Sequence, residues 1–261
     1  MLGKDQTAAQ RNRRVHFTPP SIFSLFLAAV IGFSGSVVAL AQEPTKPIPL
    51  FEQGARVLFQ GDSITDGNRG RSSDPNHILG HGYAFLIAAK HGAAFPERKL
   101  EFINRGISGH TTIDLQKRWQ ADTLDLKPDI LSVLVGANDS TKQVPLAQYE
   151  TTYDQLLASA RAANPKLRLV LCQPFVFSGG KKAADYATWR EDIRQRQQVV
   201  TKLATKYGAT VVDFQAALDA ACQRAPVEYW VWDGVHPTFS GHQILADAWE
   251  RTVRGALPAK P

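Results

Sequence analysis

The 261-residue sequence has little of several features that would define a class of protein. It has only two cysteines, and it contains no internal repeat or low-complexity tract. Its seven histidines lack the paired spacing that is typical of metal ligands. Its basic residues are scattered, whereas nucleic-acid binding calls for a continuous basic stripe. The sequence therefore predicts no metal site, no cofactor and no nucleic-acid partner.

The N-terminal 41 residues differ in kind from the rest. Four basic side chains precede the apolar run 21–33, and the stretch closes on Ala39-Leu40-Ala41. This order is typical of a secretory signal peptide, with cleavage expected after Ala41. An uncleaved anchor is the alternative, because 21–41 is about long enough to span a bilayer. We expect a periplasmic or secreted protein, with no stable membrane partner once the signal is removed.

The remaining chain has the size and composition of one domain. Without residues 1–41, 26 basic and 23 acidic side chains remain, so the high isoelectric point comes partly from the leader. Residues 42–54 are proline-rich and aperiodic, which predicts an extended linker before a domain at 55–261. Export permits a disulfide between Cys172 and Cys222, but a bridge and two free thiols both stay open. The oligomeric state is also open.

Strand and helix patterns alternate through this domain. Short apolar, β-branched runs predict strands, and longer segments ending at glycine or proline predict helices. This alternation predicts an α/β fold, a three-layer α/β/α sandwich on a mostly parallel sheet of five strands. The predicted strands are 55–60, 100–104, 129–135, 167–173 and 210–213, and the main helices are 83–90, 111–119, 146–163, 183–207 and 239–253.

A candidate nucleophile lies at the end of the first predicted strand. The motif Gly61-Asp62-Ser63 follows the apolar run 55–60, which places the hydroxyl at a carboxyl strand end, where ligands bind in open α/β sheets. Far downstream, Asp233 and His236 supply the carboxylate and the base that a serine nucleophile needs. Without the upstream motif, a helix-capping aspartate and an ordinary loop histidine would be the better interpretation.

Four blocks in this order resemble the SGNH (GDSL) hydrolase superfamily. They are Gly61-Asp62-Ser63, Gly109 within 104–109, Gly136-x-Asn138-Asp139 and Asp233-x-x-His236, and they span almost the whole mature chain. The longer strings Asn-Arg-Gly-Ile-Ser-Gly-His-Thr and Asp-Gly-Val-His-Pro-Thr resemble one branch, the bacterial GDSL-type acetylxylan esterases. The resemblance implies a flavodoxin-like sheet of five parallel strands and a Ser63-His236-Asp233 triad. It also implies an oxyanion hole formed by the N–H groups of Ser63 and Gly109 and the side-chain amide of Asn138.

Substrate contacts are predicted from position alone. Arg69 and His81 lie in the long loop 68–82 at the nucleophile's strand end, although solvated loop residues are the alternative. Trp230 and Trp232 precede Asp233 and would form an aromatic wall against a sugar ring, although core packing explains them equally well. Ser140-Thr141-Lys142 departs from relatives that carry an aromatic residue there, which leaves the acyl pocket undefined.

Three functions fit these observations. The leading hypothesis is a serine esterase that releases acetyl or other short acyl groups from carbohydrate O-esters such as acetylated xylan, so that the partner is a small-molecule or polysaccharide ester. A lysophospholipase or short-chain lipase is the alternative, but no long apolar lid segment follows the leader. The third is a non-catalytic carbohydrate-binding module, which the complete set of hydrolase residues disfavours.

Overall fold

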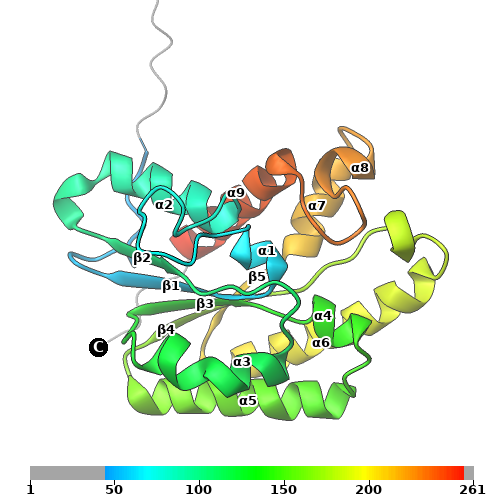
Figure 1. Ribbon diagram of the computed structural model, residues 1–261, viewed down its shortest axis with the longest axis horizontal. Coiled ribbons are helices and arrows are strands. Elements are labelled where there is room, and N and C mark those ends of the chain that lie inside the picture. Colours follow the sequence, from blue (N-terminus) through cyan, green and yellow to red (C-terminus); the bar gives the residue numbers. More distant parts are fainter. Residues whose placement is uncertain (1–44, 256–261) are drawn as a thin grey trace, which may run out of the picture. The chain divides into compact units, whose positions relative to one another are not determined.

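The computed structural model describes residues 45–255. The predicted signal peptide and the start of the predicted linker lie outside these residues. Five parallel strands form one sheet in the order β2-β1-β3-β4-β5 (Figure 1). The strands are β1 (Arg56–Gly61), β2 (Glu101–Asn104), β3 (Ile130–Leu134), β4 (Arg168–Cys172) and β5 (Thr210–Val212). This confirms the flavodoxin-like sheet, whose strand order reverses direction between β1 and β3.

Helices cover both faces of this sheet (Figure 1). On one face lie α2 (Tyr83–Ala94), α7 (Phe214–Cys222) and α9 (Phe239–Gly255), and on the other lie α3 (Thr112–Trp119), α5 (Leu146–Ala163) and α6 (Tyr186–Tyr207). The three-layer sandwich is therefore confirmed. The shorter helices are α1 (Ser63–Asp66), α4 (Ala137–Thr141), α8 (Val227–Trp230), η1 (Pro96–Arg98), η2 (Gln120–Leu124) and η3 (Gly180–Lys182).

Alternation along the strands divides the core into two layers. In β1, Val57 and Phe59 pack with α2, α7 and α9, while Leu58 packs with α3, α5 and α6. Successive side chains of a strand point to opposite faces, and both faces here are covered, so β1 is an almost unbroken apolar run. Such burial makes the strand ends rigid supports for the loops that follow them.

Helix boundaries follow local chemistry closely. The structure begins and ends α5 at the predicted residues, between Pro145 and the Asn164-Pro165 pair. The predicted helix 183–207 begins three residues later, at Tyr186, and ends as expected at Gly208, which has a φ of 60°. Glycine adopts this left-handed conformation without the steric cost that a side chain brings.

The prediction that residues 42–54 form an extended linker is wrong for the second half of this segment. Ile48 is fully buried and Phe51 is 1% exposed, so this segment is part of the domain core. The Phe51 ring lies edge-on to Phe102 at 5.6 Å and contacts Trp249 of α9 at 6.1 Å, measured between ring centroids. Burial of large apolar side chains outweighs the proline-rich composition that suggested a tether.

The question of a disulfide is answered by the structure, in which Cys172 and Cys222 are free thiols. Cys172 is buried in β4, and burial raises the pKa of its thiol to about 12. Within residues 45–255, no helix is both long and apolar enough to cross a membrane.

Candidate active site

The turn after β1 presents Ser63 at the carboxyl edge of the sheet. Asp62 caps α1 by accepting a hydrogen bond from Ile64 N–H at 3.1 Å. Gly61 has a φ of 156°, and a Cβ there would lie 2.2 Å from the carbonyl oxygen of Leu134 in β3. Only glycine therefore lets β1 end this close to β3. The sharp turn leaves the Ser63 side chain half-buried at the top of the strand, beside the point where the strand order reverses.

Three side chains from distant parts of the sequence form one hydrogen-bonded chain. Ser63 Oγ lies 2.9 Å from His236 Nε2, and His236 Nδ1 lies 2.7 Å from Asp233 Oδ2. Asp233 Oδ1 also accepts the N–H groups of Val235 and His236. Partial burial opposes ionisation of Asp233, but these hydrogen bonds hold the pKa of its carboxyl below the ordinary value. An ionised carboxylate is thus available to orient the imidazole beside the hydroxyl.

The loop that carries Asp233 and His236 is braced by its own backbone. A β-bridge joins Val231 to Pro237, and Trp232 N–H donates to the carbonyl of His236 at 3.2 Å. Behind the loop, Phe177 N–H donates to the carbonyl of Gly234 at 2.8 Å. These contacts fix the backbone of the loop from which the imidazole projects.

Two further predicted residues lie at neighbouring strand ends. Gly109, in the loop after β2, has a φ of 81°, and a Cβ added there would meet nothing within 4 Å. Asn138 lies in α4 directly after β3, and its Nδ2 donates to the carbonyl of His110 at 3.2 Å. Among the residues that the structure describes, Gly109 N–H has no hydrogen-bond acceptor. A backbone donor and an amide donor with one remaining proton therefore stand at the same edge as Ser63.

Two buried aspartates flank these groups and hold the turns. Asp139 accepts hydrogen bonds from the backbone N–H and the hydroxyl of Thr112, which tie α4 to the start of α3. Burial, together with the nearby charge of Asp139, raises the pKa of Asp62 to about 7. Burial also raises the pKa of Asp139 above its ordinary value. Asp62 therefore bonds its own turn, whereas Asp139 joins two helices.

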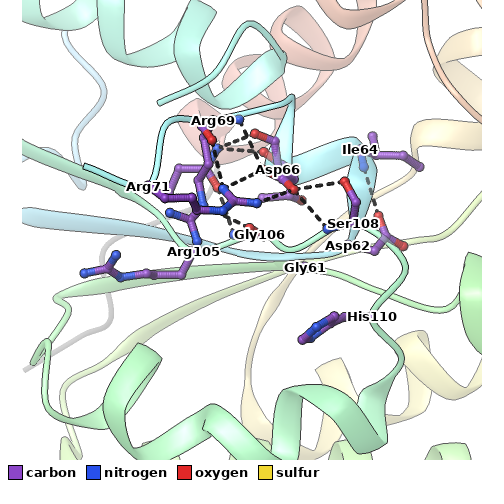
Figure 2. Close-up of polar contacts among 12 residues, drawn as sticks. Gly61, Asp62, Ile64, Asp66, Arg69, Arg71, Arg105, Gly106, Ser108 and His110 are labelled. Carbon is purple, nitrogen blue, oxygen red and sulfur yellow. Dashed lines mark hydrogen bonds and ion pairs between the residues drawn. The ribbon is translucent and has the colours of Figure 1, made fainter. Parts of the chain in front are cut away.

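A third carboxylate, Asp66, joins the loops after β1 and β2. It accepts two hydrogen bonds from Arg71 and two from the N–H and hydroxyl of Ser108, as Figure 2 shows. Burial opposes its ionisation, but these donors hold the pKa of Asp66 below the ordinary value. Sequence reasoning missed this network, and the only signal for it was the pair of arginines close behind Asp66.

The two tryptophans that were predicted to contact substrate differ in how exposed they are. Trp232 is 62% exposed, and its ring stacks on His236 at 6.4 Å between centroids. The prediction that Trp230 contacts substrate is wrong. This residue is 7% exposed, its indole N–H donates to the carbonyl of Ala225, and it belongs to the core. Trp230 is the last residue of α8 and packs in the core, whereas Trp232 lies in the loop that follows and is exposed, so the two rings do not form one wall.

The other two predicted contacts lie on the loop 68–82. Arg69 is half-buried, and its Nε donates to the carbonyl of Gly106 at 2.9 Å. Burial and the nearby Arg71 lower the pKa of Arg69 to about 10. His81 is exposed and lies edge-on to His242, 6.5 Å away between ring centroids. Within residues 45–255, no three His, Cys, Asp or Glu side chains gather closely enough to hold a metal ion.

A five-stranded parallel sheet with Ser, His and Asp joined at its carboxyl edge is an arrangement suited to ester hydrolysis. Residues 59–244 match the model of the GDSL-like Lipase/Acylhydrolase family. An acetylxylan esterase from Geobacillus stearothermophilus is 33% identical over 213 residues, which cover 77% of this chain and 94% of that esterase. The chain therefore belongs to the GDSL-like lipase/acylhydrolase family, and it is a carboxylic ester hydrolase of the GDSL type.

Solved structures agree with this assignment. A crystal structure of the Geobacillus acetylxylan esterase superposes with a TM-score of 0.69 at 32% identity, covering 80% of this chain and 98% of that one. An α/β hydrolase from the metagenome of Lake Arreo, Spain, gives a TM-score of 0.71 at 30% identity, with coverages of 78% and 97%. Catalytic mutants of the Geobacillus enzyme, each with a serine, an aspartate or a histidine replaced by alanine, have the same fold.

Proposed function

We propose that the protein is an exported serine esterase that removes acetyl groups from carbohydrate O-esters such as acetylated xylan. The observation that carries this proposal is the continuous contact from Ser63 Oγ through the His236 imidazole to Asp233. It brings a nucleophile, a base and an orienting carboxylate together at the carboxyl edge of the sheet. The leader sequence, which lies outside the described residues, supports export.

The reaction follows from these positions. His236 Nε2 takes the proton of the Ser63 hydroxyl while Oγ attacks the ester carbonyl, and Asp233 stabilises the resulting imidazolium. The tetrahedral intermediate collapses when the imidazolium gives its proton to the departing sugar hydroxyl, which leaves an acetyl group on Ser63. Water then attacks the acyl-enzyme, with His236 again as the base, and acetate is released.

The negative charge on the tetrahedral oxygen needs donors that are already in place. We assign this role to the N–H groups of Ser63 and Gly109 and to the side-chain amide of Asn138. A single donor of this kind contributes about 3 kcal/mol to lowering the barrier. The open space beside the Gly109 Cα supports the assignment, because an acyl oxygen must approach the N–H without meeting a side chain.

The substrate class rests on the relatives and on one side chain. The similar Geobacillus enzyme is an acetylxylan esterase. Trp232 places an exposed indole next to His236, where a sugar ring attached to the ester would stack on it. Arg69 and His81 on the neighbouring loop are proposed as further substrate contacts. A lipid ester is the competing substrate, and no contact in the described residues favours it.

Product analysis tests the proposal directly. The purified protein should release acetate from acetylated xylan, and it should hydrolyse p-nitrophenyl acetate faster than esters of longer acyl chains. Ser63→Ala should abolish both reactions. Acetate release that persists in Ser63→Ala would refute the serine mechanism, whereas cleavage of lysophospholipid with no acetate from any polysaccharide would refute the carbohydrate assignment.

A further inference from the structure

Asn138 of α4 and Lys142, the residue that caps the end of this helix, hold two consecutive carbonyl groups of the loop after β2. Asn138 Nδ2 donates to the carbonyl of His110 at 3.2 Å, and Lys142 Nζ donates to the carbonyl of Gly109 at 2.7 Å. The two side chains are one helical turn apart, because Lys142 N–H donates to the carbonyl of Asn138 at 2.8 Å. They therefore lie on the same side of the helix and clamp the loop onto it.

Gly109 is a position where such a clamp matters, because its backbone has little conformational restraint of its own. It has no side chain, its φ is 81°, and glycine moves easily between backbone conformations. On its N-terminal side, Ser108 is anchored to Asp66 through both its N–H and its hydroxyl, each at 2.9 Å. On its C-terminal side, the Lys142 ammonium holds the carbonyl of Gly109 itself, and the Asn138 amide holds the next carbonyl, that of His110. The Gly109 N–H lies between these anchors, and its direction depends on them.

The contact of Lys142 with the carbonyl is specific rather than incidental to an ion pair. The nearest carboxylate oxygen, Asp114 Oδ2, lies 3.7 Å from Nζ, a full ångström farther than the Gly109 carbonyl. Asp114 is also bonded by Lys117 at 3.0 Å and by the Thr111 hydroxyl at 2.9 Å. The Lys142 side chain is 53% exposed, so holding it in one conformation costs side-chain entropy that its contacts must offset.

We propose that Lys142 is a positioning residue for the esterase reaction: its ammonium fixes the Gly109 carbonyl so that Gly109 N–H and the Asn138 amide converge on one substrate oxygen. The inference rests on the proposed function, since it takes these two donors to stabilise the oxyanion. It also assigns a role to a residue of the segment 140–142, in which the sequence departs from the aromatic pattern of its relatives.

The test compares three variants of the full-length protein with p-nitrophenyl acetate as substrate. Lys142→Met removes the donor and the charge while keeping an unbranched side chain that is only one atom shorter, and Lys142→Arg keeps the donor and the charge. Lys117→Met is the matched control, because it removes an ammonium from the same carboxylate, Asp114, without touching the loop carbonyls. Each variant is assayed for kcat and KM, and its thermal unfolding midpoint is measured.

Removing an oxyanion-hole donor lowers kcat by about 10²- to 10³-fold. A donor that is still present but points in the wrong direction should lower kcat by less. We expect kcat of Lys142→Met to fall about 10-fold with KM within 2-fold of the parent, while Lys142→Arg keeps at least a third of the parental kcat. Lys117→Met should match the parent. The midpoints of all three should stay within about 2 °C of the parental value, as for most surface substitutions.

Two outcomes overturn the inference. Equal kcat values for Lys142→Met and Lys117→Met show that the contact does not affect the reaction. A loss that is equal in Lys142→Met and Lys142→Arg and that follows a lowered midpoint shows a role in stability alone. Ser63→Ala, assayed in parallel, separates this failure from a failure of the proposed function: if that variant is active, the mechanism itself is wrong, whatever the lysine variants do.

Discussion

The buried carboxyl of Asp62 should make the protein less stable as the pH rises. Burial raises the pKa of this group from 3.8 to about 7, and Asp139 and the His236 imidazole are the charged groups that act on it. Between these two pKa values, the folded protein keeps the proton and the unfolded chain has lost it. Linkage then requires the free energy of unfolding to fall with increasing pH over this interval.

The size of the effect follows from the shift. A difference of one pKa unit corresponds to 1.36 kcal/mol, so a rise of roughly three units gives at most about 4 kcal/mol between pH 4 and pH 8. Asp62→Asn removes the ionisation but keeps an oxygen that can accept the hydrogen bond from Ile64 N–H. Relative to the parent, the variant should therefore gain up to about 4 kcal/mol of stability over this range.

Urea denaturation of both proteins at several pH values between 4 and 8 measures this gain. The control is Asp154→Asn, because the hydrogen bond from Lys206 holds the pKa of Asp154 below the ordinary value. The Asp154 carboxylate loses its stabilising effect only as the pH falls below its unfolded pKa of 3.8. The difference between Asp154→Asn and the parent should therefore stay nearly constant from pH 4 to pH 8. A difference between Asp62→Asn and parent that stays constant from pH 4 to pH 8 would refute the reasoning.

Three further predictions concern the site and the core. Asp233→Asn should lower kcat on p-nitrophenyl acetate by about 10³- to 10⁴-fold with an unchanged circular dichroism spectrum, because the imidazole loses its orienting carboxylate. Trp232→Ala should raise KM for acetylated xylo-oligosaccharides about 10-fold and leave KM for p-nitrophenyl acetate unchanged; equal effects on both would remove the stacking role. Phe51→Ala should lower the free energy of unfolding in urea by about 3–5 kcal/mol, whereas a true linker residue would give no change.

Much of the fold was predictable because its signals are local. The helix α5 was bounded correctly since proline and asparagine-proline mark its ends, and the sheet followed from buried apolar runs of strand length. The same locality explains the error at Ile48 and Phe51. Phe51 packs against Trp249, almost two hundred residues later, and Ile48 belongs to the same core, whereas the prolines around them gave the opposite signal.

The sequence predicted several residues of the site, but it did not predict the contacts that hold them. Ser63 and His236 were named from motifs, and the structure brings them together. Trp230 and Trp232 were indistinguishable by composition, and only the packing of α8 on the core shows which ring is buried. The contact between Lys142 and Gly109 spans 33 residues and joins an amine to a backbone carbonyl, for which a sequence holds no pattern.

The distance along the chain between the hydroxyl and its base has a consequence for biosynthesis. Ser63 and His236 are 173 residues apart, so the ribosome adds the base long after the nucleophile. On the proposed mechanism, a nascent chain or a product of premature termination carries the nucleophile without any means of activating it. Hydrolysis begins only after synthesis has passed residue 236 and the loop that carries Asp233 and His236 has docked beside Ser63.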